Sequence, residues 1–202
     1  MLTVKVDDHE VSQLFDSLKR KMGNMTSPLN EIGAIGYSSI IKNFEVGGRY
    51  GEIGSWRGGL NRWKPLKAQT LMARNTRWAV HKNKKGEVTS RGWKTKPEKL
   101  RKLGILQVSG RLRNSITWKA SADHVIWGTN VVYAGIQHHG GKTKAHVIRA
   151  RHKKALAWPG GPGPVKSVKH PGSKIPARPF LVLQDDDILE IKRVMQRFLM
   201  AA

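Results

Sequence analysis

Apolar residues recur at regular spacings along most of this chain, but the spacing almost disappears between residues 47 and 104. Glycine, tryptophan, arginine and lysine dominate that stretch, and only 65–80 has a helical pattern. Structureless segments of this length are uncommon inside compact domains and usually serve a function. We therefore expect a long arm, ordered partly by contact with neighbouring subunits, that projects from a smaller folded body.

Two helices are predicted before the arm. Residues 2–6 alternate apolar and polar side chains and predict a short strand, after which Asp7 or Asp8 caps the first helix. A second helix is expected to begin at Ser27-Pro28, with the serine as its cap, and to end at Gly47-Gly48. The apolar stripe of the first helix is Val11, Leu14, Phe15, Leu18 and Met22.

Two glycines inside the second helix indicate how it packs. Glycine in a helix interior costs about 1 kcal/mol relative to alanine. Gly33 and Gly36 therefore predict that another element crosses this helix closely. The apolar stripe of the helix is Leu29, Ile32, Gly36, Ile40 and Phe44.

Regular patterns return at Ile105 and predict an α+β fold. We expect a small antiparallel β-sheet of roughly four strands packed against two to three helices. The predicted elements are a short helix (111–116), a hairpin (116–130), a short helix or turn (131–141), a projecting basic hairpin (145–170) and a last helix that begins at Asp185. The predicted parts of a single domain, 1–202, are an N-terminal strand with two helices (1–46), an extended basic arm (47–104), a sheet core (105–184) and a C-terminal helix (185–202).

Positive charge is concentrated in the middle of the chain. The sequence has 37 Lys+Arg and 14 Asp+Glu, a net charge of +23. Residues 53–184 hold 28 of the basic residues but only three acids, Glu87, Glu98 and Asp123. Such a body repels itself in water, so we expect a polyanion or an acidic protein surface beside it.

The sequence lacks the patterns of known catalytic and metal sites. Cysteine is absent, which removes thiolate chemistry and suits a reducing cytoplasm. There is no Gly-x-Ser-x-Gly elbow and no carboxylate pair placed as acid and base. Without a His-x-x-x-His or Glu-x-x-His spacing, we expect surface or interface histidines, no metal, no cofactor and no enzymatic activity. The histidines considered are His124, His138, His139, His146, His152 and His170.

Two glycine-rich segments, 47–59 and 159–164, could be read as phosphate-binding loops. Neither ends in the Lys-Ser/Thr of a P-loop or follows a buried strand, so mobile loops are the better interpretation. No apolar run approaches the roughly 18 residues that span a bilayer, so no membrane contact is expected.

Four segments follow one another along the chain: Trp63-Lys64-Pro65-Leu66 with Thr70, ILQVSGRLRNSI at 105–116, GTNVVYAGIQHHGG at 128–141 and IPARPFL at 175–181. The set resembles the virion morphogenesis (tail-completion or tail-terminator) family of Mu-like and P2-like phages, over roughly residues 60–200. The order and spacing of the segments are specific, whereas each segment alone would be a weak signal.

The residues of these segments have structural explanations. Gly110 can adopt backbone angles unavailable to other residues, and Ser109 can cap the short helix after it. Leu112 and Ile116 lie four residues apart and are expected to face the sheet. The two prolines of PARPF fix an extended path that directs the phenylalanine after them towards the core. The structural set is Trp63, Pro65, Leu66, Ser109, Gly110, Leu112, Ile116, Tyr133, Pro176, Pro179 and Phe180.

Tryptophans interleaved with basic residues mark the predicted contact surfaces. Trp and Arg are favoured at protein interfaces, but aromatic residues with basic neighbours also stack on bases and neutralise phosphates. No known nucleic-acid-binding module can be traced, so we favour contacts with neighbouring subunits or partners. The candidate interface residues are Trp56, Trp63, Trp78, Trp93, Arg111, Arg113, Arg149, Arg151, Lys153, Lys154 and Arg178.

The resemblance implies a structural protein of the tail or neck of the phage virion, assembled in the host cytoplasm. It implies a homo-oligomeric ring, expected to be a hexamer, that caps the tail tube and joins it to the head connector. The implied partners are further copies of the chain, the tail tube protein and the connector or neck proteins, with non-specific contact to genomic DNA left open. Two alternatives also remain open: a head-side neck or stopper component that contacts the portal or adaptor, and a non-specific nucleic-acid-binding protein.

Overall fold

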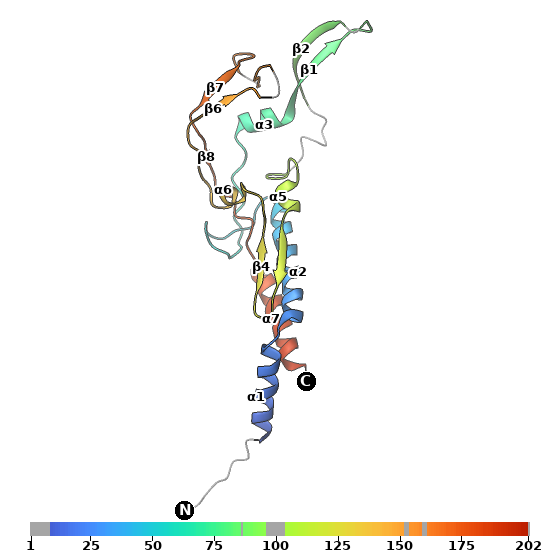
Figure 1. The fold of residues 1–202 in the computed structure, drawn as a ribbon, viewed down its shortest axis with the longest axis vertical. Coiled ribbons are helices and arrows are strands. Elements are labelled where there is room, and N and C mark those ends of the chain that lie inside the picture. The colour runs from blue at the N-terminus through green and yellow to red at the C-terminus, as the bar shows by residue number, and fades with distance from the viewer. Residues whose placement is uncertain (1–8, 86, 96–103, 152–153, 159–160, 202) are drawn as a thin grey trace, which may run out of the picture.

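The computed structural model describes residues 9–85, 87–95, 104–151, 154–158 and 161–201. The chain is elongated, with helices gathered towards one end and two β-hairpins at the other (Figure 1). The predicted α+β class is confirmed. The strand predicted over residues 2–6 lies outside the described residues.

The strands form four separate two-stranded antiparallel sheets, β1–β2, β3–β4, β5–β8 and β6–β7. The prediction of a single sheet of roughly four strands was therefore wrong for the described part of the chain. The β1–β2 and β3–β4 pairs each join consecutive strands, whereas β5 and β8 pair on either side of β6–β7 in the chain. Helix α6 separates the β3–β4 hairpin from the strands that follow. The elements in chain order are α1 (His9–Met22), α2 (Thr26–Val46), α3 (Ala68–Asn75), β1 (Thr76–Lys82), β2 (Val88–Thr95), α5 (Arg111–Asn114), β3 (Thr117–Ala120), β4 (Val125–Gly128), α6 (Ala134–His139), β5 (Gly141–Lys142), β6 (His146–Arg149), β7 (Ser167–His170), β8 (Lys174–Ile175) and α7 (Asp185–Met200).

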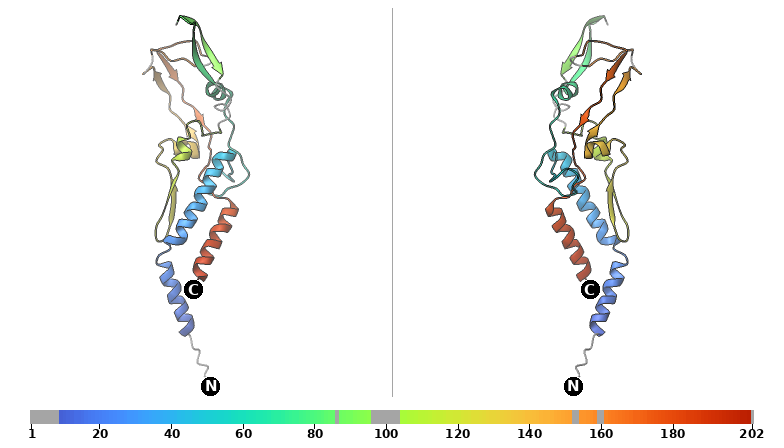
Figure 2. Two further views of the ribbon diagram at one scale, coloured as in Figure 1. Left: turned by 90° about the vertical axis from the view of Figure 1, so that its right-hand side faces the viewer. Right: turned by 90° about the vertical axis from the view of Figure 1, so that its left-hand side faces the viewer.

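Helix α2 lies at the centre of the body, between the β3–β4 hairpin on one side and α7 on the other (Figure 2). A Cβ atom added to Gly36 would lie 2.5 Å from the ring of Trp127, and one added to Gly33 would overlap the ring of Trp118. The Trp127 indole N–H also donates to the Gly33 carbonyl at 2.9 Å. The close crossing predicted from the two glycines is confirmed, and the crossing element is β3–β4.

The main core gathers around Phe44, which is fully buried. The rings of Trp63 and Phe180 lie 5.6 Å and 5.3 Å from the Phe44 ring, centroid to centroid. Leu112 and Ile116 are buried in the same cluster. The segments that carried the family resemblance therefore meet in one core, which joins α2 to the chain around α5 and to the PARPF segment.

The ends of the long helices agree only in part with those predicted from the sequence. Helix α2 begins at Thr26, so Ser27 is not its cap, and the Asn24 side chain accepts a bond from the Thr26 amide at 3.1 Å. The C-terminal end is as predicted, with Gly47 in the left-handed conformation at φ 76°. Helix α7 begins at Asp185 as predicted.

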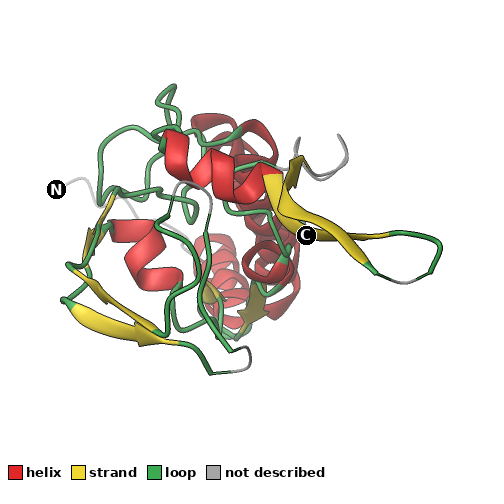
Figure 3. Ribbon diagram, turned by 90° about the horizontal axis from the view of Figure 1, so that it is seen from above, coloured by secondary structure: helices red, strands yellow, loops and turns green. Residues whose placement is uncertain are grey.

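The arm contains more regular structure than its sequence predicts. The helix expected over 65–80 stops at Asn75, because residues 76–82 form β1 and pair with β2. Seen from above, the β1–β2 hairpin projects sideways beyond the helices (Figure 3). The projecting hairpin predicted over 145–170 is present as β6–β7. None of the described helices is long and apolar enough to cross a membrane.

Candidate functional site

The segment between α2 and α3 folds back onto the start of α7; we call residues 50–62 the α2–α3 loop. Tyr50 and Asn61 exchange two backbone hydrogen bonds, of 3.2 Å and 3.1 Å, which close the loop. The Gly58 amide donates to the Leu183 carbonyl at 2.7 Å, and the Leu183 amide donates to the Trp56 carbonyl at 3.0 Å. This glycine-rich segment, predicted to be a mobile loop, is therefore hydrogen-bonded to itself and to Leu183, just before α7.

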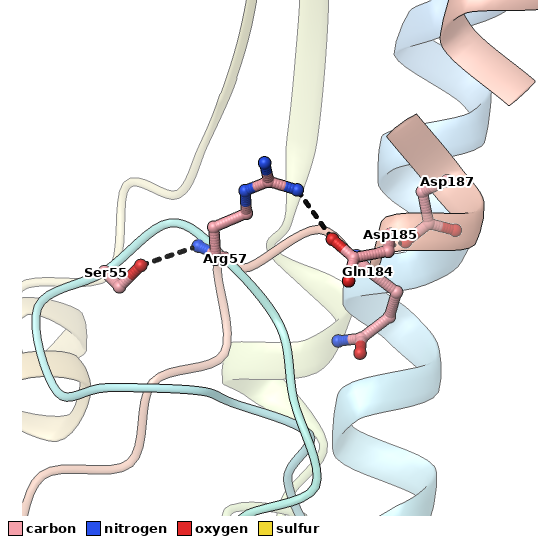
Figure 4. A network of polar contacts seen from close by, with 5 residues as sticks. All are labelled: Ser55, Arg57, Gln184, Asp185 and Asp187. Carbon is pink, nitrogen blue, oxygen red and sulfur yellow. Dashed lines mark hydrogen bonds and ion pairs between the residues drawn. The ribbon is translucent and has the colours of Figure 1, made fainter. Parts of the chain in front are cut away.

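An ion pair completes the attachment of this loop. The Arg57 guanidinium lies 2.6 Å from an Asp185 carboxylate oxygen, and the Ser55 hydroxyl accepts a bond from the Arg57 amide at 3.0 Å (Figure 4). The Gln184 side chain donates to the Arg49 carbonyl at 2.8 Å just before the loop. Backbone and side-chain bonds therefore hold the middle of the loop, and Arg49 just before it, against the residues at the start of α7.

The loop exposes three large apolar side chains although its backbone is fixed. Ile53, Trp56 and Leu60 are 63%, 59% and 98% exposed. The Arg57 guanidinium lies 5.0 Å from the centre of the Trp56 ring. Trp56 was predicted as an interface residue, whereas Ile53 and Leu60 were missed because single apolar residues between glycines show no periodicity.

Two predicted interface residues instead belong to the interior of the chain. Trp63 is 3% exposed, and its indole N–H donates to the Pro179 carbonyl at 2.8 Å. Arg178 is 6% exposed, its guanidinium donates to the Lys64 carbonyl at 3.3 Å, and burial lowers its pKa. The side chains of Trp63 and Arg178 are therefore unavailable to a neighbour in this conformation.

The short helix α5 places its two arginines differently. Arg111 is exposed, whereas Arg113, also a predicted interface residue, lies 2.7 Å from a Glu45 carboxylate oxygen. Gly110, with φ 68°, occupies the capping position that was predicted for Ser109. Ser109 lies one residue earlier, and its hydroxyl accepts a 3.4 Å bond from the Arg111 amide. The remaining motif residues are exposed (Pro65, Tyr133), half-buried (Leu66, Pro176) or buried (Pro179).

The β1–β2 and β6–β7 hairpins lie at one end of the molecule (Figure 1), and their sequences are rich in lysine and arginine. All four residues of β6 are exposed, as are Arg151 and Lys154, while Lys153 lies outside the described residues. No acidic residue occurs between Asp123 and Asp185, so nothing on this segment neutralises the charge of Arg149 and its neighbours. Trp78 and Trp93 are backbone partners in the β1–β2 pairing.

The histidines do not assemble a metal site in the described part of the chain, where no group of three potential ligand residues lies together. His138 is buried, and its Nδ1 accepts bonds from the Phe180 and Leu181 amides at 3.3 Å and 3.5 Å. Desolvation, and then the neighbouring His139, lower the pKa of His138 to about 4. His138 therefore acts as a neutral acceptor that holds the PARPF segment.

Of the four other candidate histidines besides His138 and His139, two form a pair, one lies beside a carboxylate and one falls outside the described ranges. The rings of His146 and His170 stack across β6–β7 at 5.1 Å, and His124 lies 2.6 Å from the Asp123 carboxylate. His152 is outside the described residues. These histidines therefore do not form a group of metal ligands within the described ranges.

Comparison with known proteins gives one family. The sequence model of the phage virion morphogenesis family matches residues 75–200, and this range includes three of the four segments that carry the resemblance. No curated protein and no solved structure matches the chain. The chain belongs to the phage virion morphogenesis family and is therefore a virion-associated protein with a part in phage assembly.

Proposed function

We propose that this chain is a non-enzymatic subunit of a tail-terminating ring. The ring caps the head-proximal end of the tail tube, stops further addition of tube subunits and presents its other face to the head connector. Subunits related by rotation use a heterologous interface, in which each chain offers two different surfaces to its two neighbours. The partners are further copies of the chain, the tail tube protein and the connector.

The observation that carries this proposal is the extent of uncovered surface. The chain exposes 15248 Å², whereas a compact monomer of 22.6 kDa exposes about 9,500 Å². Residues outside the described ranges would add about 3,500 Å² even if they were unfolded. A further excess of roughly 2,000 Å² remains, and two standard interfaces cover about 800 Å² each on one subunit.

The distribution of charge suits a ring with two unlike faces. Both basic hairpins lie at one end of the molecule, and helices α1 and α7 lie towards the other (Figure 1). In a ring, every subunit would present its basic end to the same side. An acidic surface on one partner would then meet only that face, which favours one docking orientation.

The proposal is tested by an infection with phage that does not produce this chain. A terminator that is missing leaves the growing end of the tube open, so we expect tails of irregular and excessive length and filled heads that stay unattached. A head-side neck component predicts a different defect: tails of normal length with heads that leak or fail to join. Normal tail lengths in the absence of the chain would therefore rule out the terminator and favour the head-side alternative.

Nucleic-acid binding is the second candidate, and the uncompensated charge of the β6–β7 hairpin favours it. Contacts between lysine or arginine and phosphates weaken steeply with salt, with a slope of about −0.9 per phosphate contacted. A DNA-binding function predicts tight binding as a monomer at physiological salt. A terminator predicts that DNA binding is lost at this salt while self-association persists.

A further inference from the structure

The α2–α3 loop has the properties of a preformed contact element. Its apolar side chains Ile53, Trp56 and Leu60 point out from a backbone that is bonded to itself and to α7. A contact surface that is already rigid loses little conformational entropy on binding. Tryptophan is also the residue type most often found among the strongest contributors to protein interfaces. The loop is therefore suited to enter a recess on another protein.

A recess of suitable size lies on the outer side of α2; we call it the α2 groove. It has a volume of about 440 Å³ and lies between α2 and α5. Tyr37 and Ile41 supply its apolar lining, Lys42 lies at its edge, and the Glu45–Arg113 ion pair closes one side. Tyr37 is partly exposed, as expected for an aromatic residue available for contact.

The loop and the groove lie on different sides of the subunit. In two perpendicular views, the loop and α5 lie on different sides of the C-terminal end of α2 (Figures 1 and 2). The loop of one subunit can therefore reach the groove of the next without using its own groove. This arrangement is the requirement for a heterologous contact that repeats around a ring.

One acid of the loop and one base of the groove form a complementary pair. Glu52 is the acid of the loop and is exposed, and Lys42 is exposed at the groove. Neither forms an ion pair with a described residue, whereas Arg57, Glu45 and Arg113 are already paired. The remaining charged residue of the loop, Arg62, donates to the Val46 carbonyl at the end of α2. A loop in a neighbouring groove would bring the Glu52 carboxylate towards the Lys42 ammonium group, and this attraction favours the contact.

We propose that the α2–α3 loop of one subunit inserts Trp56, with Ile53 and Leu60, into the α2 groove of the next copy of the chain. The inference rests on the proposed ring and identifies the surfaces that close it. It accounts for a loop that is rigid and yet leaves its apolar side chains uncovered.

Cross-linking in purified tails tests this contact, because the chain has no cysteine of its own. The test variant carries Leu60→Cys on the loop and Ser38→Cys in the groove, both at exposed positions. A short bismaleimide is preferable to a direct disulfide, which needs Cα atoms about 4.4–6.8 Å apart. The matched control pairs Leu60→Cys with Met200→Cys, which is exposed at the far end of α7.

A ladder of covalent oligomers that ends at the ring size is expected from the test variant only. Each single-cysteine variant and the control pair should stay monomeric. No ladder from the test variant in tails that contain the chain would overturn the loop-and-groove contact while leaving the ring intact. A dimer from Leu60→Cys alone would overturn it too, since two loops would then meet each other. Tails that lack the chain altogether would instead refute the proposed function.

A second measurement uses the purified full-length chain in sedimentation. Trp56→Ala is expected to weaken self-association by about 30-fold or more, the effect of removing a dominant interface residue. Ile126→Ala, at an equally exposed apolar position on β4, is the matched control and should change it by less than about 2-fold. Equal effects of the two substitutions would contradict the inference. A wild-type chain that does not associate in solution, together with a test variant that gives no ladder in tails, would contradict it as well.

Discussion

Replacing Gly36 by alanine tests the packing of the body, because two effects of the substitution oppose each other. Alanine is the better helix former by about 1 kcal/mol, which would stabilise α2. The added Cβ would lie 2.5 Å from the Trp127 ring, and overpacking of this kind costs about 1–3 kcal/mol. Moving the ring would also weaken the 2.9 Å bond to the Gly33 carbonyl, at a cost of about 1 kcal/mol. We therefore expect a net loss of about 1–3 kcal/mol in the free energy of unfolding.

Urea denaturation of the purified chain measures this loss as a lower midpoint. Gly135→Ala is the matched control, since Gly135 lies in helix α6 and an added Cβ there meets no atom within 4 Å, so this variant should be neutral or more stable. Trp127→Phe should make room for the methyl group, so Gly36→Ala should cost less in that background. A Gly36→Ala variant as stable as the wild type would show that β3–β4 does not cross α2 at this point.

Three further predictions concern polar groups of the body. The pKa of His138 is about 4 in the folded chain against an ordinary 6.5. The free energy of unfolding should therefore fall by about 3 kcal/mol as the pH drops from 6.5 to 4. His138→Asn should reduce this pH dependence, as measured by urea titrations at several pH values. Asn43 is fully buried and donates to two backbone carbonyls, so Asn43→Ala should cost at least about 3 kcal/mol in the same assay. Arg57→Ala removes an exposed ion pair with Asp185, so it should lower the free energy of unfolding by less than about 1 kcal/mol, as measured by thermal unfolding. A larger loss would mean that the α2–α3 loop contributes to folding of the core.

The helical body could be predicted because its signals are local. The spacing of apolar residues located α1, α2 and α7, and the glycine after α2 marked its end. Gly33 and Gly36 even predicted a close crossing, since a helix keeps such glycines only where packing compensates for them. Their partners, Trp118 and Trp127, could not be identified from the sequence, because the pairing depends on how the β3–β4 hairpin lies on α2.

The arm was predicted less well because distant contacts determine its structure. Residues 76–82 show a pattern that fits a helix or a strand, and only pairing with 88–95 selects the strand. The α2–α3 loop is fixed by bonds to Leu183 and Asp185, more than 100 residues away along the chain. Trp63 had the composition of an interface residue, but the Pro179 carbonyl gives its indole N–H a partner inside the core.

Imaging of the neck of purified virions tests whether this chain forms the terminating ring. We expect a ring of this chain between the last ring of the tail tube and the head connector, with the basic β1–β2 and β6–β7 hairpins of all subunits on one face. Tails assembled separately from heads should already carry the ring. A chain that is absent from purified tails, or is found only on isolated heads, would contradict the proposed role as a tail terminator.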